Sequence, residues 1–158
     1  MTRRLRSERG FALIEMLAAI VLINIGILAM LLALSSGVLT LRRSAQLSTA
    51  SVVADKQIEQ YRAMTYSSVY LDTTSLTSTD STYRSDAAYS ATQVSQTCSP
   101  LVSACTPSQT IAGPDGRSYR VDTYVVGGRA VKQVTVVVRK AGTTATLARA
   151  LSTFDQDF

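Results

Sequence analysis

An uncharged apolar run near the start of the chain limits what it can fold into. Residues 16–34 carry no charge and are interrupted only by Asn24 and Gly26. A run of about 20 apolar residues is long enough to cross the hydrocarbon core of a bilayer as one helix. The sequence therefore predicts a membrane-inserted segment followed by a single small folding unit, because 158 residues are too few for two ordinary domains beyond it.

Basic residues lie on both sides of this run: Arg3, Arg4, Arg6 and Arg9 before it, against the single acid Glu8, and Arg42 and Arg43 after it. The excess before the run supplies much of the net charge of +5 and predicts an N-terminus in the cytoplasm, with the remainder of the chain outside. A secretory signal peptide cut after Ser35 is the alternative. Its apolar region would exceed the usual seven to fifteen or so residues, and the carboxylate of Glu15 stands at its threshold.

Helical periodicity continues beyond the apolar run. Apolar residues recur at steps of three and four at Leu47, Ala50, Ala54, Ile58 and Tyr61. The pattern predicts one helix over about residues 11–64, fully apolar in its first half and amphipathic in its second. The run Ser35, Ser36 and Gly37 is a point where this helix could bend.

The residues just before the apolar run form a motif with a known likeness. The segment Arg9-Gly10-Phe11-Ala12-Leu13-Ile14-Glu15 resembles the cleavage and methylation site of type IV pilins and type II secretion pseudopilins. A short basic leader ends in glycine, phenylalanine follows, and glutamate is the fifth residue after the cut. The resemblance implies that a prepilin peptidase cleaves between Gly10 and Phe11 and that the new amine of Phe11 is methylated. Ala12 departs from the usual threonine or serine.

The same resemblance gives Glu15 a role in assembly. It implies that the carboxylate pairs with the amine of Phe11 on a neighbouring subunit and so sets the register of subunits in a filament. The alternative is a carboxylate at the lipid interface, favoured by the positive end of the helix dipole. Asn24 could bridge neighbouring helices or simply be tolerated among them.

The resemblance also predicts partners and domain boundaries. The partners are a prepilin peptidase, other pilin or pseudopilin subunits, an inner-membrane assembly platform and the membrane itself. Major pilins commonly carry a proline in the apolar segment, whereas none precedes Pro100 here. Residues 25–29 and 54–62 instead resemble minor pilins and minor pseudopilins. We expect a leader at residues 1–10, the filament-core half of the helix at residues 11–36 and an exported domain at residues 37–158.

The first part of the exported domain, residues 65–96, is rich in serine, threonine and tyrosine and is predicted to be an irregular connection. Its tyrosines, with one from the helix, either form an adhesive surface or supply the aromatic part of a thin core; they are Tyr61, Tyr66, Tyr70, Tyr83 and Tyr89. Cys98 and Cys105, the only cysteines, lie outside the membrane in this topology and predict a disulfide. A metal site there is not convincing, because the chain has no histidine.

Alternating residues after the turn signal at residues 113–116 predict antiparallel strands. Residues 119–125, 134–138 and 147–151 alternate, with residues 110–112 as a possible fourth strand. Gly127 and Gly128 are expected to form a two-residue hairpin turn, and Ala141 and Gly142 the next turn. The predicted fold class is α+β, with the amphipathic half of the long helix packed on one face of a sheet of three to four strands.

The chemistry of an enzyme is not found in the sequence. There is no histidine to act as a base, no glycine-rich phosphate loop and no carboxylate pair in a catalytic context, so we expect no catalysis and no cofactor. Basic residues around the strands are expected to lie on a solvated sheet face, with a DNA-binding stripe as the alternative; they are Arg117, Arg120, Arg129, Lys132, Arg139, Lys140 and Arg149. Asp155 and Asp157 could bind calcium but are expected to form an acidic tail.

These observations favour a minor type IV pilin. The alternatives are a minor pseudopilin of a type II secretion system and a single-pass envelope protein that keeps its helix as a permanent anchor and binds a ligand with its exported domain. The first residue of the mature protein separates three outcomes: methylated Phe11 for a filament subunit, Met1 for an anchor, and Ser36 for a secreted protein.

Overall fold

The computed structural model describes residues 9–76, 80–99, 102–128 and 130–156, with side chains from residue 13 onward. The chain forms two compact units, Met1–Arg43 and Ser44–Phe158. We refer to them as unit 1 and unit 2 and describe each by itself.

One helix, α1 (Arg9–Arg62), runs through the described part of unit 1 and into unit 2. This confirms the single long helix, and its ends lie within two residues of the predicted ones. The helix is not interrupted at Ser35, Ser36 or Gly37. The hydroxyl of Ser35 donates to the carbonyl of Leu32 at 2.9 Å, and that of Ser36 to the carbonyl of Ala33 at 3.1 Å. Both hydroxyls are therefore hydrogen-bonded within the helix, which continues without a break.

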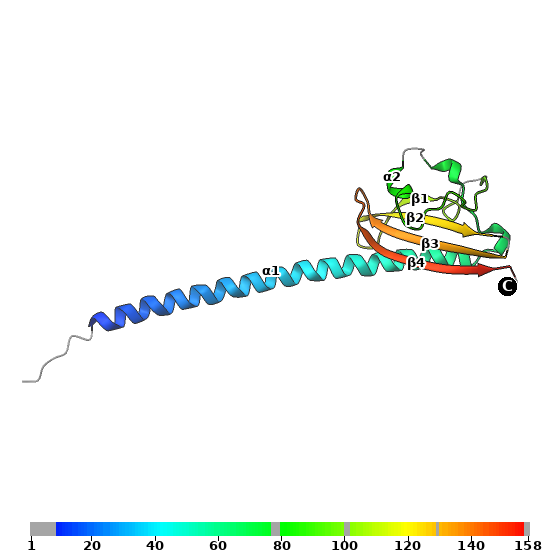
Figure 1. Ribbon diagram of the computed structural model, residues 1–158. Helices are drawn as coiled ribbons and strands as arrows, with labels where there is room; N and C mark the ends of the chain where they lie inside the picture. The colour runs from blue at the N-terminus through cyan, green and yellow to red at the C-terminus, as the bar shows by residue number, and fades with distance from the viewer. Residues whose placement is uncertain (1–8, 77–79, 100–101, 129, 157–158) are drawn as a thin grey trace, which may run out of the picture. The chain divides into compact units, whose positions relative to one another are not determined.

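Unit 2 is built on a four-stranded antiparallel sheet (Figure 1). The strands are β1 (Ser108–Ala112), β2 (Ser118–Gly127), β3 (Val131–Lys140) and β4 (Thr146–Asp155), and each pairs with its neighbours in sequence. Valine, threonine and tyrosine dominate the two central strands, which suits a pleated and buried surface. The predicted α+β fold class is confirmed, and the possible fourth strand exists and begins at Ser108.

The main core lies between this sheet and the part of α1 that belongs to unit 2 (Figure 1). Cross-strand pairing places Val121 opposite Val138 and Val125 opposite Val134, so the apolar sets of β2 and β3 share one face. Helix residues that were expected to face the sheet are buried against them: Ala50, Ala54, Ile58 and Tyr61. The helical periodicity therefore identified the buried face of α1 from Ala50 onward, but it was wrong for Leu47, which is 40% exposed.

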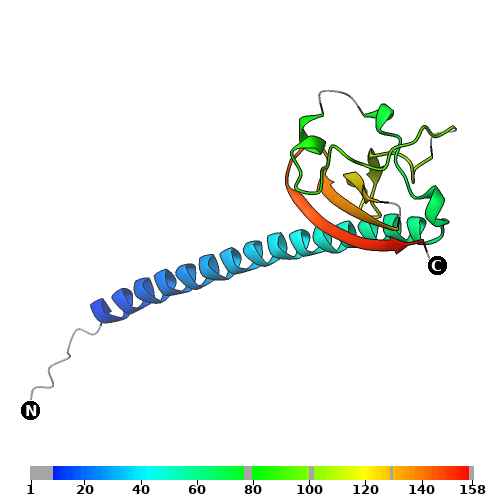
Figure 2. The same ribbon diagram turned by 45° about the vertical axis from the view of Figure 1, so that its right-hand side comes forward.

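The other face of the sheet is covered by the connection between α1 and β1 (Figure 2). This connection includes the single-turn helices η1 (Tyr66–Ser68) and η2 (Thr73–Ser75) and the short helix α2 (Ser81–Arg84). The ring of Tyr83 stacks on that of Tyr124 with centroids 4.4 Å apart, and both side chains are fully buried. The connection is thus largely irregular, as predicted, but it is packed as a third layer.

The turn between β2 and β3 differs from the predicted two-residue turn. The ladder ends at the pair Gly127 and Lys132, and the N–H of Gly128 donates to the carbonyl of Val131 at 3.1 Å. A Cβ at residue 127 would collide with the backbone of Val131, so glycine is needed in the ladder rather than in the turn. The prediction of a two-residue turn at Gly127 and Gly128 is wrong because Gly127 is still paired in the ladder, so the chain reverses after it.

Strand β4 packs both small and large apolar residues against the main core. Ala148, Ala150 and Phe154 pack against the main core, whereas Leu151 is 58% exposed. The register shifts by one residue beside Val138, which lets Leu147 join the same core although it precedes Ala148 directly.

Candidate functional site

The N-terminal part of α1 carries the residues that the sequence singled out. The backbone of Gly10 and Phe11 is helical and belongs to the first turn of α1, while the Phe11 side chain lies outside the described part of the chain. The side chain of Glu15 is exposed and makes no hydrogen bond or ion pair with any residue that the structure describes. Unit 1 thus supplies no partner for this carboxylate within the described residues, and none of these placements tests the predicted cleavage or register roles.

Every described side chain from residue 13 to residue 45 is exposed. Leu13 and Ile14 are 64% and 70% exposed, and the large apolar side chains that follow are similar. The described helix Leu13–Arg62 contains a window that is long and apolar enough to cross a membrane, and none of that window is buried. An apolar surface of this extent needs lipid or other apolar helices to cover it.

Several uncharged polar side chains on this surface form a hydrogen bond with their own helix. The amide of Asn24 donates to the carbonyl of Ile20 at 2.9 Å, and the hydroxyl of Thr40 donates to the carbonyl of Ser36 at 3.0 Å. Such bonds remove most of the free-energy penalty of placing a polar group in hydrocarbon. Asn24 still has one N–H and its oxygen available, so both of its predicted roles remain open.

Unit 2 contains a chain of alternating charges on the sheet face opposite α1. Arg120 contacts Asp80 at 2.7 Å and Asp122 at 2.8 Å, and Arg139 bridges Asp122 and Asp86. A third arginine, Arg149 of β4, donates to the same Asp86 carboxylate at 2.8 Å and 3.0 Å. We call this set of three arginines and three aspartates the charge network: Arg120, Arg139, Arg149, Asp80, Asp86 and Asp122.

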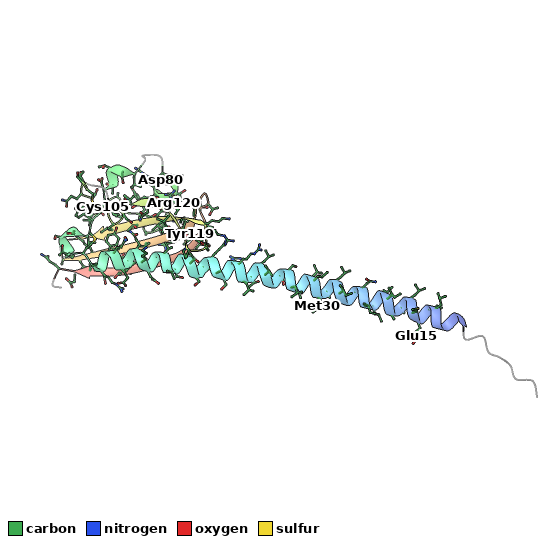
Figure 3. All side chains as sticks on the ribbon, turned by 180° about the vertical axis from the view of Figure 1, so that it is seen from behind. Glu15, Met30, Asp80, Cys105, Tyr119 and Arg120 are labelled. Carbon is green, nitrogen blue, oxygen red and sulfur yellow. A yellow bond between two sulfur atoms is a disulfide. The ribbon has the colours of Figure 1, made fainter. Side chains whose placement is uncertain are left out.

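Burial and donors act in opposite directions on the network's outer carboxylates. Burial tends to raise the pKa of Asp80 and of Asp86. For each, a backbone N–H donor and the paired arginine outweigh burial and hold the pKa below its ordinary value. Both groups are therefore ionised at neutral pH and fix the connection to the sheet. Figure 3 shows Asp80 and Arg120 together on the side of the sheet away from α1.

The predicted solvated sheet face is wrong for two arginines of this network, Arg120 and Arg139, whereas Arg149 is 40% exposed. The side chain of Arg139 is only 4% exposed, and Arg120 is largely buried. Lys132 is also buried; its ammonium donates to the carbonyl of Tyr66 at 2.7 Å and lies 4.4 Å from the centre of that ring, and burial lowers its pKa. Arg129 lies outside the described residues. Because Arg120, Lys132 and Arg139 are buried or ion-paired, the strand cations that the structure describes do not form a continuous basic stripe.

The two cysteines are joined by a disulfide, which confirms that prediction. Asp72 fastens the resulting loop: its carboxylate accepts from the N–H of Cys98 at 3.0 Å, and its own N–H donates to the carbonyl of Cys105 at 2.8 Å. Bonds from the hydroxyl of Thr74 and then from the Cys98 N–H hold the pKa of Asp72 below its usual value. The loop also meets α1, since the hydroxyl of Tyr61 donates to the carbonyl of the residue before Cys105.

Three of the five tyrosines that the sequence singled out pack in the hydrophobic cores: Tyr61, Tyr83 and Tyr89. Tyr61 and Tyr83 are fully buried, and Tyr66, Tyr70 and Tyr89 are partly buried. No cluster of three or more metal-binding side chains occurs among the described residues. Asp155 lies at the end of β4 instead of in a tail, and Asp157 falls outside the described residues.

The charge network was missed by sequence reasoning. Its signals were Asp122, an acid in the middle of a strand, and the acids Asp80 and Asp86 in a stretch of mostly uncharged polar residues. An acid between apolar strand residues usually has a buried cationic partner, because an unpaired carboxylate is too unfavourable there. Pairing it with particular arginines required knowing which face of the sheet the connection covers.

The comparisons with known proteins agree with the motif. A family model described as the prokaryotic N-terminal methylation motif matches residues 5–31. No curated protein and no solved structure matches the chain. The matched segment contains Gly10, Phe11, Glu15 and most of the apolar run. This motif, with an apolar N-terminal helix and an α+β domain, supports placing the chain in the type IV pilin and pseudopilin family.

Proposed function

We propose that the chain is the precursor of a minor type IV pilin, a structural subunit and not an enzyme. A prepilin peptidase would cleave between Gly10 and Phe11, and the mature subunit would enter a filament through its N-terminal helix. Such a filament could act in adhesion, motility or DNA uptake. The observation that carries the proposal is a helix that exposes apolar side chains on all sides directly after a methylation motif.

Proteolysis has a clear physical purpose under this proposal. With the leader attached, the helix spans the cytoplasmic membrane with its N-terminus in the cytoplasm. Withdrawing it outward would pull the leader arginines through hydrocarbon, at about 3 kcal/mol for each. Cleavage after Gly10 removes these charges, and the helix can then leave the bilayer for a bundle of similar helices. Gly10 also favours cleavage, since glycine at a helix end unwinds easily into the extended form that proteases bind.

Glu15 would then acquire the partner that it lacks among the described residues. In a bundle of apolar helices an unpaired carboxylate is strongly unfavourable, and the methylated amine of Phe11 on a neighbouring subunit could neutralise it. Only one axial offset between subunits brings these two groups together. The pair would therefore set the register, while the apolar surface provides most of the attraction.

A minor pseudopilin of a type II secretion system is the second candidate. It is favoured by the same motif, which both groups share, and by the lack of proline throughout α1. The two candidates predict the same processing and differ in the assembly that incorporates the mature subunit. Recovery with purified surface pili supports the pilin, and recovery with the envelope secretion machinery supports the pseudopilin.

The test is the mature N-terminus, read by mass spectrometry after expression with and without a prepilin peptidase. The proposal predicts N-methylated Phe11 with the peptidase and Met1 without it. Gly10→Ala should block conversion, while Gly26→Ala should not, because a Cβ added at residue 26 has nothing within 4 Å. Conversion of Gly10→Ala at the parental rate would contradict the proposal. Met1 retained in the presence of the peptidase would indicate a permanent anchor, and Ser36 a secreted protein.

A further inference from the structure

A pocket of about 220 Å³ lies within the connection between α1 and β1. This connection forms the layer on the side of the sheet away from α1 (Figure 1). The pocket belongs to unit 2 alone, and no residue of the charge network lines it. We call it the connection pocket, and the lining residues that matter below are Thr73, Leu76, Arg84, Tyr89, Gln93 and Ser95.

The lining of the connection pocket is held in place by contacts with the layer beneath it. The ring of Tyr89 packs edge-on against the fully buried ring of Tyr83, with centroids 6.1 Å apart. The hydroxyl of Tyr83 donates to the side-chain oxygen of Gln93 at 2.9 Å, and the N–H of Val94 donates to the carbonyl of Val125 at 2.9 Å. A pocket that is fixed in this way before binding loses less conformational entropy when a ligand arrives.

Three polar groups of the connection pocket make no hydrogen bond or ion pair with the residues that the structure describes. They are the guanidinium of Arg84, the side-chain nitrogen of Gln93 and the hydroxyl of Tyr89. The hydroxyls of Thr73 and Ser95, by contrast, contact each other at 2.6 Å. All three unused groups carry N–H or O–H donors, so the pocket suits a ligand that is rich in acceptor oxygens.

Arg84 also gives the connection pocket a positive charge that the neighbouring acids do not neutralise. Asp80 and Asp86, the acids nearest to it in the chain, are paired with arginines of the charge network. Asp72 directs its carboxylate to donors elsewhere and does not line the pocket. The exposed guanidinium of Arg84 is therefore available to an external anion, and its fork of donors fits a carboxylate through two parallel hydrogen bonds.

The apolar part of the lining points to a ring-shaped ligand. The ring of Tyr89 and the side chain of Leu76 present apolar surface, and an aromatic ring suits the C–H face of a sugar. The volume of about 220 Å³ lies below the roughly 300 Å³ at which pockets for drug-sized ligands begin, so the pocket has room for one ring rather than for several.

We propose that the connection pocket binds a single sugar unit that carries a carboxylate, such as a uronic acid of an extracellular polysaccharide. Arg84 holds the carboxylate, the ring of Tyr89 covers one face of the sugar, and Gln93 donates to a hydroxyl of the sugar. The inference rests on the export of unit 2 under the proposed function, and it gives the exported domain a ligand of defined chemistry.

The test is ligand-observed nuclear magnetic resonance on the full-length protein in a zwitterionic detergent without a sugar headgroup. Methyl glucuronide is compared with methyl glucoside, which lacks the carboxylate, and with acetate, which lacks the ring. The proposal predicts that methyl glucuronide binds about tenfold more tightly than either, as one hydrogen bond to a charged group would produce, with saturation transfer to the C–H protons of its ring. Equal affinity for the glucuronide and the glucoside would overturn the proposal, and so would equal affinity for acetate, which would indicate a simple anion site.

Variants identify the group responsible. Arg84→Gln should weaken the binding of methyl glucuronide about tenfold and leave the binding of methyl glucoside unchanged. Arg117→Gln is the matched control, because Arg117 is an exposed cation that lines a different pocket, and it should bind both sugars as the parent does. Undiminished glucuronide binding by Arg84→Gln would refute the assignment. The N-terminal processing assay does not involve this pocket and reports separately on the proposed function.

Discussion

Replacing Arg139 with methionine removes the central cation of the charge network while keeping most of the volume of the side chain. The guanidinium bridges Asp122 and Asp86. The exposed fraction of the side chain is 4% for Arg139, 0% for Asp122 and 5% for Asp86. Removing one partner from a buried ion pair typically destabilises a protein by about 3–5 kcal/mol, because a buried charge is left uncompensated. Arg139→Met should therefore weaken the attachment of the connection to the sheet.

The structure places the expected loss at the lower end of this range. Asp122 keeps Arg120 at 2.8 Å and the hydroxyl of Ser108 at 2.6 Å, and Asp86 keeps Arg149 at 2.8 Å. Each carboxylate thus keeps a cationic partner in the variant, so we expect the free energy of unfolding to fall by about 3 kcal/mol. For a domain of this size that loss corresponds to a fall of roughly 10 °C in Tm.

Urea unfolding of the full-length protein in detergent measures this loss. The stacked rings of Tyr83 and Tyr124 provide a near-ultraviolet circular dichroism signal for the sheet face that the connection covers. Arg149→Met is the matched control: its side chain is 40% exposed, and its loss should decrease stability by only about 0.5 kcal/mol. If the loss for Arg139→Met is no larger than that for Arg149→Met, the buried pairs do not hold the two layers together and the reasoning fails.

Three further predictions follow from the described contacts. The folded-state pKa values of Asp80 and Asp86 lie below their unfolded-state values. The stability that these carboxylates contribute is therefore present above about pH 4 and is lost as pH falls through the folded-state values. Asp86→Asn should make the free energy of unfolding less dependent on pH in this acidic range. Cys98→Ser should lower the free energy of unfolding by about 2–3 kcal/mol, and a reductant should have this effect on the parent but not on the variant. Glu15→Ala should leave peptidase processing intact but greatly reduce the amount of mature subunit in purified filaments. Glu59→Ala, at an exposed carboxylate paired with Arg62, should change neither processing nor incorporation. Normal incorporation of Glu15→Ala would exclude the register role.

Local patterns were sufficient to predict most of the fold. The spacing of Ala50, Ala54, Ile58 and Tyr61 depends only on the helical repeat, and all four residues are buried as that repeat requires. The strands could also be predicted, because alternating apolar residues are a local signal. The motif at the start of α1 was readable for the same reason, since its residues are consecutive.

Contacts between distant segments were not predictable in this way. Asp86 and Arg139 are far apart in sequence, and nothing local to either residue indicates the other. The strand arginines were expected to face solvent because a small antiparallel sheet usually leaves one face open. The expectation was wrong because the connection between α1 and β1 covers this face of the sheet. The same layer also buries Tyr83.

Anchoring the connection at a few buried points has an evolutionary consequence. Tyr83, Asp86 and Asp72 fix it to the sheet and to the disulfide loop, while many residues between them face outward. Substitutions at outward positions generally change stability by less than about 0.5 kcal/mol. Outward-facing residues of the connection can therefore be replaced during evolution while the buried anchor residues and the scaffold stay the same.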